Sequence, residues 1–114
     1  MARISTHVLD TANGKPAAGM RIGLYACAGE TRRLVKTATT NADGRTGEPL
    51  LAGDALAAGV YELVFHVGEY FALPGEAPSF LGEVVVRFGV SGAAENYHVP
   101  LLVSPYAYST YRGS

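Results

Sequence analysis

The residues of this chain best suited to proton transfer are its three histidines, His7, His66 and His98. A neutral imidazole is a natural general base near neutral pH, because its ordinary pKa is about 6.5. Each histidine lies in a run of alternating apolar residues, where a packed, hydrogen-bonded histidine is the commoner case. His7 and His98, however, fall on the face opposite the larger apolar set of their own strands. We therefore interpret His7 and His98 as candidate catalytic residues and His66 as structural.

A cationic side chain and the end of the sequence supply the other candidates. Arg45 follows an Asn-Ala-Asp-Gly turn, and its guanidinium is suited to grip a carboxylate or a planar oxyanion with two parallel hydrogen bonds. The alternative is an exposed arginine at a strand end, which is the commoner case. The last four residues are Tyr111, Arg112, Gly113 and Ser114. They either line a site or form a frayed terminus.

The sequence lacks the common motifs for nucleophilic serine, zinc, phosphate-binding and dinucleotide-binding sites. It contains no GxSxG, HExxH, P-loop or GxGxxG pattern, and no cysteine or carboxylate stands at zinc-ligand spacing from the histidines. We therefore expect neither a metal nor an organic cofactor. Cys27 is the single cysteine, which excludes an intramolecular disulfide, and we interpret it as a small apolar strand residue.

Charge and hydropathy limit the partners and the cellular location that we expect for this protein. The formal net charge is −1 and no basic run exceeds Arg32-Arg33, which argues against a nucleic-acid partner. No apolar stretch approaches the roughly 18 residues that span a bilayer. The first residues lack the apolar centre of a signal peptide, so we expect a protein of the cytoplasm.

The hydrophobic pattern indicates an all-β fold. The chain has 114 residues, 48% of them hydrophobic and 17% charged, which suits one globular domain over residues 1–114. Strand-like alternation recurs over residues 4–9, 20–27, 34–40, 60–67, 84–90, 97–103 and 106–111. Turn signals, such as Asn13-Gly14 and Asp43-Gly44, separate these runs. Seven or eight short strands spaced in this way predict a β-sandwich.

Helix and proline signals add detail to this prediction. The only plausible helix lies between residues 69 and 81, and prolines 74 and 78 make it short or broken. Residues 52–59 are also compatible with one helical turn. Pro100 interrupts a strand pattern and so predicts an edge strand or a bulge.

Three segments of the sequence resemble the transthyretin-like family, and in particular its enzyme branch, the 5-hydroxyisourate hydrolases. They are residues Ile4–Asp10 with Asn13–Ala17, Thr40–Arg45, and Tyr97–Tyr106 with Tyr108–Ser114. Tyr61–Phe65 and Tyr70-Phe71 also resemble the family's central strand and its exit. The terminal Tyr-Arg-Gly-Ser is the most specific element, because it separates the hydrolases from the hormone carrier.

The resemblance implies a fold, an assembly and a site. The fold is a sandwich of two four-stranded sheets with one short helix, and the assembly is a homotetramer built as a dimer of dimers. The site lies in the channel between dimers, with His7, Arg45 and His98 as catalytic residues. Arg45 also binds substrate, together with the terminal residues Tyr111, Arg112, Gly113 and Ser114. The one departure is residues 73–78, which are unusually rich in proline for the family's helix region.

The activity implied by the resemblance is hydrolysis of 5-hydroxyisourate, an oxidised purine formed in urate breakdown. Opening its six-membered ring at an amide-like bond gives OHCU, a ureidoimidazoline carboxylate, with no metal involved. The sequence leaves open which histidine is the base and which orients the water or shuttles the proton. Two other functions stay open: a hormone-type carrier on the same fold, and a structural or adhesion sandwich. The polar candidates His7, Arg45 and His98 argue against both.

Overall fold

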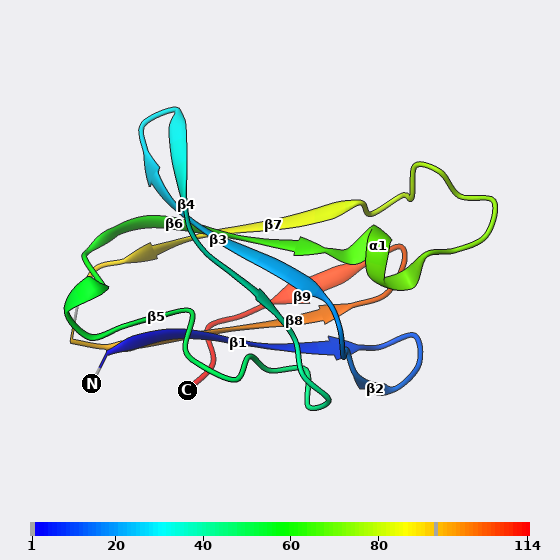
Figure 1. Cartoon of the computed structure of the whole chain (residues 1–114), viewed down its shortest axis with the longest axis horizontal. Helices are drawn as coiled ribbons and strands as arrows, with labels where there is room; N and C mark the ends of the chain where they lie inside the picture. The colour runs from blue at the N-terminus through cyan, green and yellow to red at the C-terminus, as the bar shows by residue number, and fades with distance from the viewer. Residues whose placement is uncertain (1, 93) are drawn as a thin grey trace.

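Two β-sheets packed face to face form this protein, with one short helix at one end of the sandwich (Figure 1). The computed structural model describes residues 2–92 and 94–114. In chain order the elements are β1 (Arg3–Asp10), β2 (Lys15–Pro16), β3 (Arg21–Ala28), β4 (Thr31–Thr39), β5 (Leu51–Ala52), the 3-10 turn η1 (Gly53–Ala55), β6 (Gly59–His66), α1 (Val67–Phe71), β7 (Glu83–Val90), β8 (Asn96–Val103) and β9 (Tyr108–Thr110).

One of the two sheets contains a parallel strand pair, whereas the other is antiparallel throughout. One sheet has the order β2-β1-β8-β9, and β5 and β2 pair with opposite ends of β1. The other has the order β4-β3-β6-β7 and is antiparallel throughout. The pairing of β1 with β8 is parallel and runs without a shift from Arg3 opposite Asn96 to Asp10 opposite Val103. The N-terminal and C-terminal strands of the chain therefore lie side by side (Figure 1).

Alternation along the strands divides each sheet into a core face and an outer face. On β1, Ile4, Thr6 and Val8 are buried, whereas Ser5 and His7 are only half-buried. β8 follows the same rule, with Tyr97, Val99, Leu101 and Val103 inside. From the other sheet, the core receives Ile22, Leu24, Leu63, Phe65, Val84 and Val86. Since neighbouring residues of a strand point to opposite faces, the residues between the core positions of β1 and β8 share one outer surface.

The predicted sandwich of two sheets with one short helix is confirmed, with differences in detail. β2 and β5 have two residues each, so the described residues form nine strands, and the first sheet has five rather than four. The helix is α1, which ends where Ala72 adopts a left-handed conformation, before the proline-rich residues 73–78. The helical turn expected within residues 52–59 is present as η1.

The prediction for Pro100 was wrong about its strand. β8 has a neighbour on each side, and its register with β1 shows no bulge at Pro100. The lack of an N–H at Pro100 instead affects the pairing of β8 with residues 108–113. β8 pairs with these residues at Leu101 and again at His98, but not at Pro100. The Pro100 carbonyl accepts a 2.7 Å hydrogen bond from the Thr110 hydroxyl. Proline thus interrupts the ladder opposite Tyr111.

No helix in the described part of the chain is both long and apolar enough to cross a membrane.

A buried carboxylate connects the end of β1 to the helix. Asp10 is 1% exposed and accepts hydrogen bonds from the Asn13 amide groups and, at 2.8 Å, from the Tyr70 hydroxyl. Burial acts to raise the pKa of Asp10, but these hydrogen bonds outweigh it and leave that pKa below its usual value. Burial and the neighbouring carboxylate raise the pKa of Tyr70 to about 12, so Tyr70 remains a donor.

Tyr70→Phe should lower the free energy of unfolding by about 1.5–3 kcal/mol, the range for a hydrogen bond to a charged group. The measurement is urea unfolding followed by circular dichroism, at pH 7 and at one fixed protein concentration. Tyr106→Phe is the matched control, because Tyr106 also donates to a carboxylate, that of Glu76, but is exposed. Equal stability of Tyr70→Phe and the unsubstituted protein would show that this contact does not anchor the helix.

Candidate functional site

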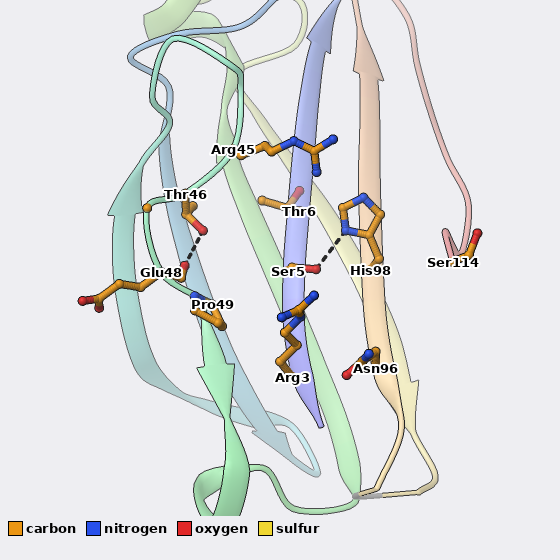
Figure 2. A pocket seen from close by; sticks show the side chains of 11 residues that line it. Arg3, Ser5, Thr6, Arg45, Thr46, Glu48, Pro49, Asn96, His98 and Ser114 are labelled. Atoms are coloured by element: carbon orange, nitrogen blue, oxygen red, sulfur yellow. Dashed lines mark hydrogen bonds between the residues drawn. The ribbon is translucent and has the colours of Figure 1, made fainter. Parts of the chain in front are cut away.

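An open pocket of about 380 Å³ lies on the outer face of the β1–β8 pair. Figure 2 shows side chains from β1, β8, the loop after β4 and the last residue converging on it. Its lining is Arg3, Ser5, Thr6, Arg45, Thr46, Gly47, Glu48, Pro49, Asn96, His98 and Ser114. Of the residues predicted from the sequence, Arg45, His98 and Ser114 therefore line one pocket.

His98 is the titratable base of this pocket. It is half-buried on β8, opposite Ser5 of β1, and its Nδ1 lies 2.9 Å from the Ser5 hydroxyl. Burial lowers the pKa of His98 below its ordinary value, and the electrostatic effects of Arg45, His7 and Arg3 lower it further. The imidazole is therefore neutral at pH 7, which is the form that accepts a proton.

His7 lies on the same outer face of β1, two residues after Ser5, and is opposite Pro100 of β8. Its Nε2 is 2.9 Å from the carbonyl oxygen of Asp43. A carbonyl only accepts, so Nε2 carries the proton and Nδ1 is the basic nitrogen of neutral His7. His7 is close enough to affect the ionisation of His98, but it does not itself line the pocket.

The loop that carries Arg45 is fixed against β1 by Gly44. Gly44 has a φ of +75°, and a Cβ there would lie 2.3 Å from the carbonyl oxygen of Val8. The Gly44 carbonyl accepts a 2.8 Å hydrogen bond from the Val8 amide. The Asn41 side chain accepts from the Arg45 amide, and the Arg45 carbonyl accepts from the Asn41 amide. The Asn-Ala-Asp-Gly turn thus positions the arginine and supplies the carbonyl that holds His7.

The pocket has a positive electrostatic character. Arg45 and Arg3 both line it, and within residues 2–92 and 94–114 neither pairs with a carboxylate. The rim carboxylate, Glu48, pairs with Lys36 instead, and its side chain points away from His98 (Figure 2). An anionic or electron-rich ligand suits this arrangement.

The four terminal residues separate into two groups. Gly113 donates a 2.8 Å hydrogen bond to the His98 carbonyl, and Ser114 reaches the pocket. Tyr111 and Arg112 line a different groove, against Val86 and Phe88 on the β7 side. In this chain the structure therefore brings Gly113 and Ser114, but not the Tyr111 and Arg112 side chains, to His98.

Contacts within the chain hold the Arg112 side chain away from the pocket. Its guanidinium pairs with Glu95 at 3.2 Å and donates to the Asn96 carbonyl at 3.0 Å. It also lies over the Tyr97 ring, 4.4 Å from the ring centroid. Gly113 does not have a left-handed φ, so its backbone conformation alone does not require glycine. Glycine is needed there since a Cβ would lie 2.6 Å from Cδ2 of the His98 ring.

Sequence reasoning missed Arg3, Ser5 and Asn96. These residues have the same strand parity as His7 and His98, so alternation places them on the same face. His66, interpreted as structural, lies on the other sheet, where its Nδ1 is 3.7 Å from a Glu83 carboxylate oxygen.

Histidine, cysteine, aspartate and glutamate side chains do not gather in groups of three or more at metal-binding distances within residues 2–92 and 94–114.

Comparison with known proteins identifies the relatives of this chain. Residues 4–113 match the HIUase/Transthyretin family. 5-hydroxyisourate hydrolase 2 of Rhizobium meliloti (strain 1021) is 55% identical over 115 residues, covering 98% of this chain and 96% of the relative.

Two solved structures show the same fold. A 5-hydroxyisourate hydrolase from Klebsiella pneumoniae superposes with a TM-score of 0.82 at 33% identity and full coverage of both chains. A crystal structure of (S)-allantoin synthase matches 99% of this chain with a TM-score of 0.89 and 45% identity, and this chain spans 44% of that one. The chain belongs to the HIUase/Transthyretin family.

Proposed function

We propose that this protein is a hydrolase that opens the six-membered ring of 5-hydroxyisourate to give OHCU. The proposal rests on the 55% identity, over nearly the full length of both chains, to 5-hydroxyisourate hydrolase 2 of Rhizobium meliloti. In this chain a neutral His98 and Arg45 line the same pocket. A carrier site for an apolar hormone would not need a histidine and two guanidinium groups in its lining.

The proposed reaction begins at His98. Its Nδ1 faces Ser5, so Nε2 is the nitrogen available to a water molecule in the pocket. Nε2 takes a proton from the water while the oxygen attacks the ring carbonyl. The amide-like C–N bond then breaks, and the carbonyl carbon, which now carries the oxygen of the water, becomes a carboxyl group. The proton passes from His98 to the leaving nitrogen. His7, whose basic Nδ1 is held on the same face, relays the proton or orients the water.

Arg45 supplies the charge that this reaction requires. Attack on the carbonyl places negative charge on its oxygen, and a guanidinium within the pocket stabilises that charge. Arg45 carries no carboxylate partner in the described residues, so its donors are available to the oxyanion. The site therefore needs no metal ion as a Lewis acid.

The proposal includes assembly and location. The pocket is open in the single chain, so a second copy covering the outer face of β1 and β8 would exclude water from it. Exposed residues on or directly after the edge strands β7 and β9, among them Val85, Tyr108 and Tyr111, suit contacts between copies. We expect a homotetramer, a dimer of dimers. Tyr111 and Arg112 lie away from the pocket of their own chain, so they would contribute to a substrate site only across an interface with another copy. The cytoplasm is the expected compartment, where the free Cys27 would remain reduced.

Adding the protein to freshly generated 5-hydroxyisourate should accelerate its decay far beyond the spontaneous rate. Ultraviolet absorbance follows the loss of substrate directly. An unchanged decay with folded protein present would contradict the proposal, and binding of a thyroid-hormone-like ligand by that same sample would favour the carrier.

His98→Asn and His7→Asn should each lower kcat by about 10²-fold or more, the usual effect of losing a general base. Arg45→Ala should raise KM and lower kcat, since it contacts the ligand in both ground and transition states. His66→Asn is the matched control, because His66 lies on the other sheet, and it should turn over normally. Near-normal rates for all three site variants would place the reaction elsewhere.

Gly113→Ala should lower kcat by about 10- to 100-fold, because the added methyl group displaces the His98 ring and small displacements at a reacting centre are costly. Gly89→Ala provides the control, as no atom lies within 4 Å of a Cβ at that position of β7. Size-exclusion chromatography and circular dichroism would check assembly and fold. Full activity in Gly113→Ala would mean that close packing of the last residues on His98 is irrelevant to catalysis.

A further inference from the structure

The Ser5 hydroxyl is in direct contact with the candidate base. Ser5 and His98 are opposite each other in the parallel β1–β8 ladder, and both side chains lie on its outer face. Ser5 Oγ is 2.9 Å from His98 Nδ1, although the two residues are 93 positions apart in sequence. Figure 2 shows this contact as the dashed line at the centre of the pocket, with the other ring nitrogen on the Arg45 side.

Such a hydrogen bond allows two arrangements of the proton. In one, Nδ1–H donates to Ser5 Oγ and Nε2 presents a lone pair to the pocket. In the other, the serine donates to Nδ1 and Nε2–H points into the pocket, where it cannot accept a proton. A base requires the first arrangement.

The surrounding charges favour the first arrangement. The groups that act electrostatically on His98 are Arg45 from the loop after β4, and Arg3 and His7 from β1. Glu48, paired with Lys36 on the rim, and the last residue, Ser114, also line the pocket. The negative end of a neutral imidazole dipole is its unprotonated nitrogen, and it is stabilised when it points toward positive charge. Arg45 lies on the Nε2 side of the ring, whereas the Arg3 side chain lies on the Ser5 side (Figure 2), and Arg45 has the larger electrostatic effect on His98. Arg45 therefore draws the lone pair to Nε2, which leaves the proton on Nδ1 and makes Ser5 the acceptor.

We infer that Ser5 is a positioning residue that holds His98 with its proton on Nδ1 and its basic Nε2 directed into the pocket. This inference rests on the proposed hydrolase function. When Nε2 takes a proton from water, Nδ1–H continues to donate to Ser5, so the same contact stabilises the imidazolium that forms. It thereby opposes the effect of Arg45 and Arg3, which disfavour that cation.

The test compares Ser5→Ala with Ser5→Thr, which keeps the hydroxyl. Thr37→Ala is the control, since it removes an exposed hydroxyl from the other sheet. Long-range ¹H–¹⁵N correlation spectra report which nitrogen of His98 carries the proton in the resting protein, with the signals identified from the His98→Asn spectrum. Kinetics against pH supply the second readout.

Ser5→Ala should move His98 toward the form protonated at Nε2 and lower kcat by about 3- to 10-fold with KM little changed, the scale of one lost hydrogen bond. Its acid limb of kcat/KM should shift to lower pH, because the imidazolium loses an acceptor. Ser5→Thr should restore both readouts, and Thr37→Ala should change neither.

Two results would overturn the inference. One is a Ser5→Ala protein with the tautomer and acid limb of the unsubstituted protein. The other is a covalent acyl adduct on Ser5, detected by mass spectrometry during turnover, which would make the serine a nucleophile. The spectra need no substrate, so they separate this inference from the proposed function: a protein without hydrolase activity whose His98 tautomer still responds to Ser5→Ala refutes the function alone.

Discussion

The parallel pairing of β1 with β8 is the constraint on which the site depends. It is the one parallel pairing among the described strands, and it joins segments from the two ends of the sequence. A parallel pair needs a long crossover, and here the crossover contains the whole second sheet. The buried Thr6 hydroxyl donates a 2.7 Å hydrogen bond to the Val99 carbonyl across this pair. The register that buries the core is therefore also the register that places Ser5 beside His98.

Because side chains alternate in direction along β1 and β8, the hydrophobic core and the candidate site lie on opposite faces of this strand pair. Most inner positions carry apolar side chains of the core, whereas the outer positions at the pocket carry polar and titratable ones. The outer face is only partly desolvated, which is enough to lower the pKa of His98 without burying an unpaired charge. Two small structural devices complete the site: Gly44 fixes the loop of Arg45 against β1, and Gly113 allows the last residues to pack on the His98 ring.

Much of this arrangement was predictable from the sequence, because its signals are local. Period-two alternation identified the long strands, and turn signals correctly marked Gly14 and Gly44, whose φ values are positive. His98 and Arg45, which the sequence pattern had already singled out, line one pocket. Ser5 and Arg3 were missed because no local pattern specifies that β1 pairs with β8, or in which register. The separation of Tyr111 and Arg112 from Gly113 was missed because it depends on how the last residues pair with β8, at His98 but not at Pro100, and on the Glu95 ion pair.

The β1–β8 pair holds a neutral histidine among positive charges at pH 7. An NMR titration of the histidine ring protons in the folded protein measures this most directly. We predict that the pKa of His98 lies below about 6.5, the ordinary value for histidine, and that Arg45→Ala raises it by removing a positive charge. A His98 that titrates at or above the ordinary value, and does not respond to Arg45→Ala, would contradict it.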